Sequence, residues 1–130
     1  MLNNLNAVSP YLLSVLRIVF ALVLFSFGTQ KILGFPFAAR VPEAFSLSWI
    51  AGVFELVVGF FLLIGFLSRP AAFILSGLMA CAYFIGHAPN SFFPSQNGGV
   101  AAILFCFGFL YLVAAGPGPL SIDAWRKAKA

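Results

Sequence analysis

Four stretches of this 130-residue chain are each long and apolar enough to cross a bilayer. They cover residues 11–33, 49–67, 70–87 and 99–115. A membrane-spanning helix needs roughly 20 mostly apolar residues, because its backbone amides must find their partners inside the segment. Little chain is left over for a soluble domain. The sequence therefore predicts one all-α membrane domain over residues 1–130, an antiparallel bundle of four transmembrane helices.

The overall composition supports this assignment. Hydrophobic residues make up 62% of the chain and charged residues 8%, which a soluble domain could carry only by exposing large apolar patches. The net charge of +4 is scattered between the apolar stretches and forms no basic face with interleaved aromatic residues. We therefore expect the lipid bilayer as a partner and no nucleic acid. A second copy of the chain and an oxidoreductase are further candidate partners.

Capping residues predict where the helices begin and end. Ser9 and Pro10 have the pattern of a helix N-terminus, and Ser68 with Pro70 repeats it for the third span. The last span should end at the Gly-Pro-Gly-Pro sequence of residues 116–119.

The segments outside the spans carry weaker signals. Proline and glycine predict a loop over residues 34–48, with a short interfacial helix at 43–45. After Ser121 we expect a short amphipathic tail, whose tryptophan and basic residues suit a layer of anionic headgroups.

Lysine and arginine predict the orientation, because short cytoplasmic loops are rich in them. The first ten residues contain neither, so no cleaved signal peptide is expected. The side that holds both termini has more lysine and arginine residues than the other side, which predicts that both termini are cytoplasmic. That side carries Arg69, Arg126, Lys127 and Lys129 with Arg17 nearby, and the other side carries Lys31 and Arg40.

Glu55 lies six residues beyond Trp49, which marks the start of the second span. At 1.5 Å per residue this is roughly 9 Å below the interface. An ionisable group at such depth is expensive and usually faces the bundle interior. Gly52 and Gly59 share its helical face and allow a neighbouring helix to approach. Two interpretations follow: a proton-handling or ligand-contacting group, or a lock that hydrogen-bonds two helices.

Arg17 lies seven residues past Pro10 in the first span, about 10 Å deep. It can snorkel to the headgroups or pair with the tail, or it can point inward as a ligand-binding residue. Arg69 and Asp123 have opposite charges on the same side of the membrane and are predicted to form a structural ion pair.

The side of the bundle away from the termini holds further polar candidates. His87 can carry a proton near neutral pH or hydrogen-bond a ligand carbonyl, and its alternative is a solvated loop residue. Lys31 and Asn97 are candidate ligand-binding residues beside it. Cys81 and Cys106 are expected to share a layer on neighbouring helices, either as a redox pair or as small apolar packing residues. No ligand spacing for a metal is evident.

The order of several motifs makes the chain resemble the DoxX family. The likeness runs from the first span to the tail. Its motifs are Arg17, Gly28-Thr29-Gln30-Lys31, Glu55 with Gly59, the turn of residues 65–72, His87, Asn97-Gly98-Gly99 and residues 116–123.

This resemblance implies a small four-helix protein of the bacterial inner membrane. DoxD-like members are linked to quinone-coupled thiosulfate oxidation, and others are associated with membrane oxidoreductase complexes and oxidative-stress defence. The chain lacks the additional soluble part of the thiosulfate enzyme.

Three functional hypotheses result. The first is a membrane component of a quinone-linked oxidoreductase or redox-stress system, with Glu55 and His87 exchanging protons with quinone and Lys31, Asn97 and Arg17 binding it. Electrons would come from a partner, because no cofactor motif is present. The second is a non-enzymatic scaffold or assembly partner. The third is a small-solute or proton pathway.

Overall fold

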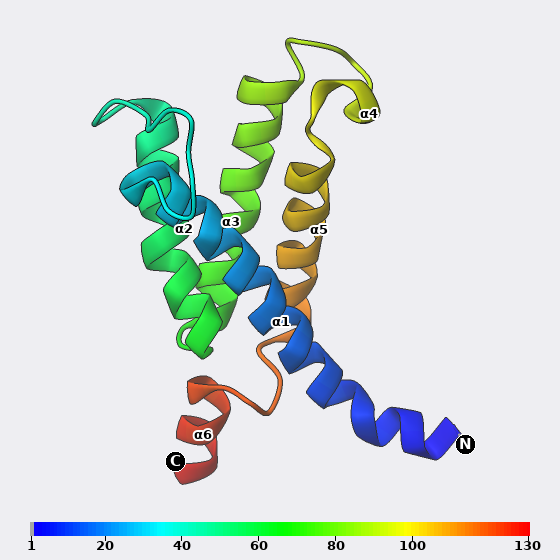
Figure 1. Ribbon diagram of the computed structural model, residues 1–130. Coiled ribbons are helices and arrows are strands. Elements are labelled where there is room, and N and C mark those ends of the chain that lie inside the picture. Colours follow the sequence, from blue (N-terminus) through cyan, green and yellow to red (C-terminus); the bar gives the residue numbers. More distant parts are fainter. Residues whose placement is uncertain (1) are drawn as a thin grey trace.

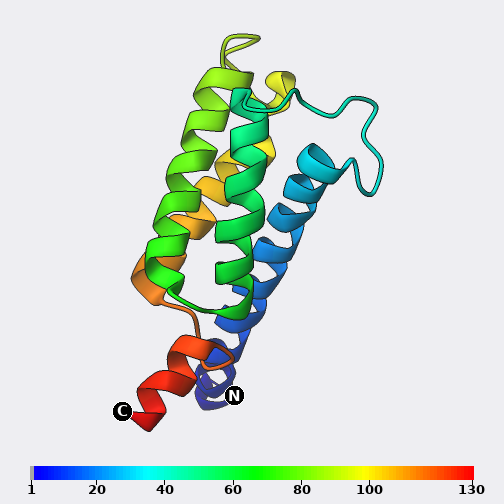
Figure 2. The same ribbon diagram turned by 90° about the vertical axis from the view of Figure 1, so that its left-hand side faces the viewer.

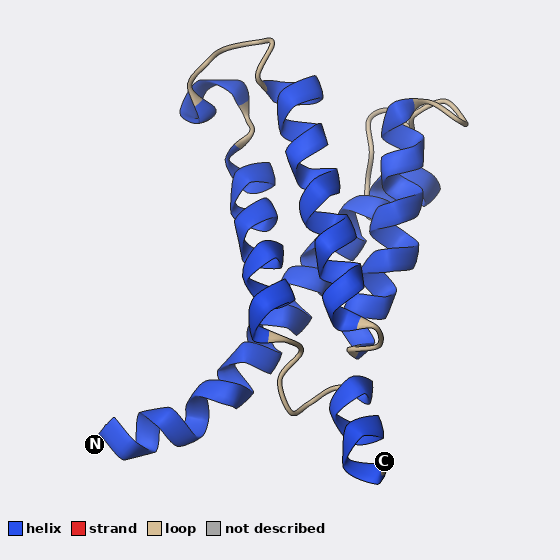
Figure 3. Ribbon diagram, turned by 180° about the vertical axis from the view of Figure 1, so that it is seen from behind, coloured by secondary structure: helices blue, strands red, loops and turns tan. Residues whose placement is uncertain are grey.

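The computed structural model describes the backbone of residues 2–130 and the side chains of residues 4–130. Within this range the regular secondary structure is all helical and there are no strands (Figure 3). The elements in chain order are α1 Leu2–Leu33, α2 Leu47–Ile64, α3 Ser68–Ala82, the π-helix η1 Tyr83–His87, α4 Pro94–Asn97, α5 Val100–Ala115 and α6 Ile122–Lys129.

The long helices alternate in direction, so the bundle is antiparallel (Figure 1). Both ends of the chain lie at one end of the bundle, here called the terminal end (Figures 1 and 2). The opposite end, called the loop end, carries the connections around residues 34–46 and 88–99. The predicted four-helix bundle is confirmed. The cytoplasmic placement of the terminal end stays a prediction from the charge count.

Three of the helices are long and apolar enough to span a membrane: residues 4–33, 47–64 and 68–87. The third reaches His87, where the predicted span also ends, because η1 continues α3 without a break. The fourth, α5, has 16 residues and therefore a length of about 24 Å. It begins and ends within a residue of the prediction.

The predicted start of the first helix at Ser9 is wrong. α1 begins at Leu2, and Pro10 lies inside it. Proline removes one backbone hydrogen bond and crowds the preceding turn. That turn is exposed and leaves the bundle (Figure 1), so no packed neighbour amplifies the disturbance. The helix consequently continues on both sides of the proline.

The predicted interfacial helix at 43–45 is also absent: the structure has a turn there. Phe45 adopts a left-handed φ of 64°, which interrupts any helix. The next residue, Ser46, is extended, and its hydroxyl accepts a hydrogen bond from Trp49 N–H. This cap starts α2 two residues before the predicted position.

The bundle consists of two close helix pairs. α1 packs mainly on α2, and α3 packs mainly on α5, whereas α1 and α5 have few contacts. The buried core lies between the pairs toward the terminal end, and Phe20 packs edge-on against Phe105 and Phe109. Its buried residues are Ala21, Leu24, Leu62, Ala71, Ala72, Leu75, Met79, Phe109 and Leu112.

Candidate functional site

Glu55 faces the interior of the bundle, as the sequence predicts. Its exposed fraction is 2%, and Gly52, Gly59 and Leu62 are buried along the same face of α2. Gly52 allows α1 to come close, because an added Cβ there would lie 2.8 Å from the Cβ of Lys31. The close approach expected at Gly59 does not occur: no atom lies within 4 Å of an added Cβ.

The Lys31 ammonium reaches Glu55 from the last turn of α1. Its Nζ lies 2.6 Å from Glu55 Oε1, and 28% of the lysine side chain is exposed. The two residues come from facing helices, so the ion pair ties α1 to α2 at the loop end. Because Lys31 is two residues from the end of its helix and partly exposed, this pair connects the buried carboxylate to the loop end of the bundle.

The second oxygen of Glu55 is unused. Oε2 is buried and has no hydrogen-bond partner among the described residues. Buried polar atoms are nearly always satisfied, so an orphaned carboxylate oxygen marks a place for a water molecule or a ligand. Only a donor can satisfy it, because the carboxylate in an ion pair is an acceptor.

His87 and Asn97 form a second polar cluster at the loop end. His87 Nδ1 lies 2.9 Å from the backbone carbonyl of Asn97. A carbonyl only accepts, so Nδ1 carries the hydrogen and Nε2 of the neutral ring keeps its lone pair. The Asn97 side chain is buried, accepts from Gly99 N–H at 2.7 Å and donates to Tyr83 Oη at 3.3 Å.

Tyr83 is a residue that sequence reasoning missed. Its ring stacks on His87 with centroids 6.5 Å apart, within the π-helix η1. Single π-helical turns are frequent at functional sites. The signal was the four-residue spacing between Tyr83 and His87, which places both on one helix face.

The structure therefore separates the candidates into two clusters. Lys31 and Glu55 join α1 to α2, whereas His87 and Asn97 join the end of η1 to the end of α4. Among the described residues, no hydrogen bond or ion pair joins the two clusters. The predicted grouping of all four residues around one head group is not formed by direct contacts.

Arg17 points inward and does not snorkel. It is 1% exposed and donates to the carbonyls of Pro117 at 2.8 Å, Leu120 at 2.7 Å and Leu63 at 3.4 Å. These carbonyls belong to the chain after α5 and to the end of α2. Because its terminal nitrogens are engaged by the backbone, Arg17 fits a structural lock and not the predicted ligand contact.

The predicted ion pair between Arg69 and Asp123 does not form. Arg69 donates to the carbonyls of Val113 and Ala114 at 2.6 and 2.8 Å, at the end of α5. The Asp123 carboxylate instead accepts from the backbone N–H groups of Leu67 and Ser68 at 3.0 and 2.8 Å. Arg69 thus binds unpaired carbonyls at the C-terminus of α5, and Asp123 binds unpaired N–H groups at the N-terminus of α3.

Ser68 is not the predicted side-chain cap of the third span, because α3 already includes it and Leu67 before it is left-handed. Asp123 supplies the cap from the tail. Burial pushes the pKa of Asp123 upward, but the hydrogen bonds from Ser68 and Leu67 outweigh this effect and hold the pKa below its ordinary value.

The two cysteines are free. Cys81 is exposed on α3, and Cys106 Sγ lies 3.6 Å from the hydroxyl of Ser76. Ser76 and Cys81 are five residues apart and so lie on different faces of α3. Cys106 therefore packs against the serine face, which fits a packing role.

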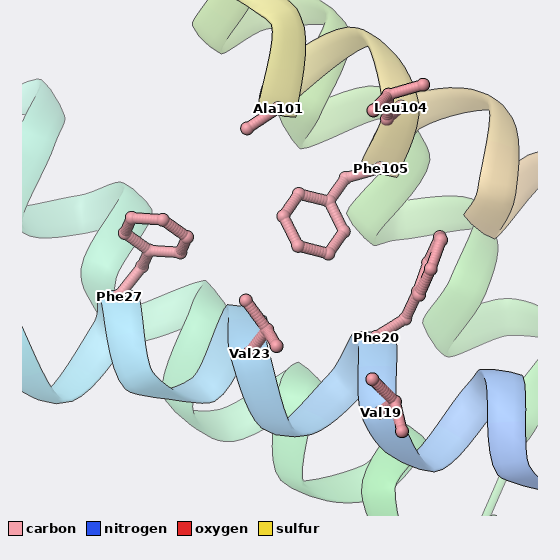
Figure 4. Close-up of a pocket in the computed structure, with 7 residues that line it drawn as sticks. All are labelled: Val19, Phe20, Val23, Phe27, Ala101, Leu104 and Phe105. Carbon is pink, nitrogen blue, oxygen red and sulfur yellow. The ribbon is translucent and has the colours of Figure 1, made fainter.

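An apolar groove lies where α1 and α5 diverge (Figure 4). Its volume is about 340 Å³, and aromatic rings of Phe20, Phe27 and Phe105 line it together with aliphatic side chains. Phe27 is one helical turn before Lys31. The sequence did not predict this groove, because helix periodicity does not say which neighbouring helices diverge.

The fold and the buried polar pairs define a multi-pass helical membrane protein with ionisable groups inside the bundle. The DoxX family model matches residues 12–88, which is more than half of the chain. The protein belongs to the DoxX family.

Two related proteins align with nearly the whole chain. A Haemophilus influenzae protein described as uncharacterized is 42% identical over 130 residues, which cover 94% of this chain and 96% of the relative. The inner membrane protein YphA of Escherichia coli K12 is 27% identical over 136 residues, which cover 92% and 94%. No solved structure gives a significant match.

Proposed function

We propose that this protein is an inner-membrane component of a quinone-linked redox system, in which the Lys31–Glu55 pair binds the head group of a membrane quinone. The observation that carries the proposal is the buried Glu55 Oε2 without a partner, next to an ammonium that retains further donors. The inner-membrane location is supported by the name of the relative YphA.

The proposed site has the parts that a quinone requires. A quinone that accepts two electrons also takes up two protons, and a lysine–carboxylate pair at the membrane surface can exchange protons with water. Lys31 provides that connection, because 28% of its side chain is exposed. The aromatic groove between α1 and α5 offers an apolar surface for the isoprenoid tail, with Phe27 one turn from Lys31. A partner oxidoreductase would exchange the electrons.

Binding of a short-chain quinone to the purified protein in nanodiscs tests the proposal. We expect Glu55→Gln to lower the affinity at least tenfold, because the amide cannot hold the ion pair that positions Lys31. Glu43→Gln is the matched control, since Glu43 lies in the exposed loop and pairs only loosely with Arg40 at 4.0 Å. Unchanged affinity in Glu55→Gln, or no quinone binding by the parent protein, contradicts the proposal.

A scaffold function is the second candidate, favoured by the way Arg17 uses its terminal nitrogens on the backbone of its own chain. In that case the ion pair is a helix lock as well. Glu55→Gln would then lower the thermal stability of the bundle and leave the activity of a host complex intact. The redox proposal expects lost activity in the same variant.

A further inference from the structure

Gly59 differs from the other buried glycines of the described residues. At Gly28, Gly52, Gly65, Gly99 and Gly116, an added Cβ would meet another part of the chain within 3.2 Å. At Gly59 it would meet no atom within 4 Å, although the residue is buried. At the five other buried glycines, the missing side chain therefore allows another part of the chain to pack closely. At Gly59 no part of the chain occupies the space that a side chain would fill.

Helix stability does not explain a glycine at this position. In a helix interior glycine is less favourable than alanine, because its backbone loses more freedom on folding. The space beside Gly59 would accept a methyl group. Retaining glycine there keeps a space open on the inner face of α2.

Gly59 lies one helical turn from Glu55, the residue with the orphaned carboxylate oxygen. Residues four apart on a helix are neighbours, with Cβ positions about 5–6 Å apart. Glu55 is 2% exposed, and its Oε2 has no partner. Glu55, whose Oε2 lacks a partner, and Gly59, over which a space is unfilled, thus lie one turn apart on one buried face of α2, and a single bound molecule that reaches both would account for both.

The polarity of the two residues restricts the chemical group that fits. Glu55 Oε2 can only accept a hydrogen bond, and the Lys31 ammonium can only donate one. A hydroxyl group satisfies both, because its hydrogen goes to Oε2 while its oxygen accepts from Lys31. A carbonyl satisfies Lys31 alone and leaves Oε2 orphaned.

We propose that Glu55, Lys31 and the space over Gly59 form one subsite for a ring that bears a hydroxyl group. In terms of the proposed function, on which this inference rests, the site prefers the reduced quinol to the quinone. Glu55 and Lys31 hold the hydroxyl, and Gly59 admits the ring.

The first experiment fills the space over Gly59. Affinity for a short-chain quinol is measured under anaerobic conditions for the parent protein, Gly59→Ala and Gly59→Leu. We expect the leucine to weaken binding at least tenfold and the alanine to weaken it less, while the alanine raises the melting temperature. Gly77→Leu is the matched control, because Gly77 lies on an exposed face of α3 with equally open space.

The second experiment compares ligands on the parent protein. We expect at least tenfold tighter binding of the quinol than of its dimethyl ether, which has the same ring and no hydroxyl hydrogen. The oxidised quinone should fall between them or match the ether.

The outcomes separate this inference from the proposed function. Absence of binding by either redox form defeats both. Quinone binding that needs Glu55 but is unaffected by Gly59→Leu, or equal affinity for quinol and ether, overturns the subsite and leaves the proposed function standing. A change of oligomeric state in Gly59→Leu without a change in ligand affinity also overturns it, because the space would then belong to a second copy of the chain.

Discussion

The carboxylate of Asp123 accepts a 2.8 Å hydrogen bond from the backbone N–H of Ser68, at the first residue of α3. A second bond comes from the N–H of Leu67 at 3.0 Å. In return, Asp123 N–H donates to the carbonyl of Gly65 at 2.9 Å. The tail thereby caps α3 and closes the turn between α2 and α3.

Removal of this cap should loosen the terminal end. Loss of a capping side chain costs about 1 kcal/mol, and we expect Asp123→Ala to lower the unfolding free energy by roughly that amount. Thermal unfolding in detergent, followed by circular dichroism, measures the change. Asp123→Asn keeps one acceptor oxygen and should restore part of the loss. An alanine variant as stable as the parent would show that α6 does not cap α3.

The same carboxylate makes stability depend on pH. The pKa of Asp123 is below its ordinary value in the folded protein, so the ionised form is the one that folding favours. Its contribution is fully present above about pH 4 and is lost as the pH falls through the folded pKa. The stability difference between the parent and Asp123→Ala should be constant from pH 5 to 8 and shrink below pH 4. A difference that persists at low pH would contradict this assignment.

Arg17 should be the most sensitive charged position of the bundle. It is 1% exposed, and its shortest bonds join it to the carbonyls of Leu120 and Pro117. Hydrogen bonds to a charged group contribute about 1.5–3 kcal/mol each, so Arg17→Met should lower stability by roughly 3 kcal/mol. Arg40→Met, in the exposed loop, serves as the control and should have no effect. Equal melting temperatures for both variants would show that the guanidinium is dispensable.

The Lys31–Glu55 pair should behave as a coupled unit. Lys31→Met leaves a carboxylate buried without its cation, and because Lys31 is partly exposed we expect a loss of about 1–3 kcal/mol. The double variant Lys31→Met with Glu55→Leu should regain most of it, since well-packed apolar residues replace a buried ion pair at little cost. A double-mutant cycle of melting temperatures measures the coupling, and strictly additive effects would speak against the pair.

Gly28 is the position where α1 and α2 should tolerate no side chain. An added Cβ would lie 2.9 Å from the backbone nitrogen of Leu56 and 3.0 Å from the carbonyl of Gly52. Backbone cannot move aside as a flexible side chain can, so Gly28→Ala should destabilise the protein by about 1–3 kcal/mol. Gly86→Ala, with open space around it, is the control. Unchanged thermal stability in Gly28→Ala would mean that the helices can separate.

Sequence reasoning succeeded where the signal is local or chemical. The apolar runs predict the spans because their length must match the bilayer, and Glu55 faces inward because lipid offers a carboxylate no partner. Lys31 and Asn97 were singled out as polar groups at the correct end, although they enter different clusters.

The failed predictions of charge partners share one physical cause. Arg69 and Asp123 were expected to pair because their charges are opposite, yet each binds backbone groups at a helix end. The donors that Asp123 meets are N–H groups at the start of α3, which have no partner within the helix. Residue identity does not show which backbone groups become hydrogen-bond partners, because nearly every residue has the same ones. The carbonyls that bind Arg17 could not be predicted for this reason.

The bonds of Arg17 also bear on the order of biosynthesis. Its partners Pro117 and Leu120 follow it by 100 and 103 residues. At about 5–20 residues per second, translation needs roughly 5–20 s to supply them. During that time the guanidinium in α1 has only the longer 3.4 Å bond to the Leu63 carbonyl available. The ribosome must reach residue 120 before the first helix can make its shortest bonds. Truncation shortly before residue 117 should therefore leave the nascent bundle unclosed.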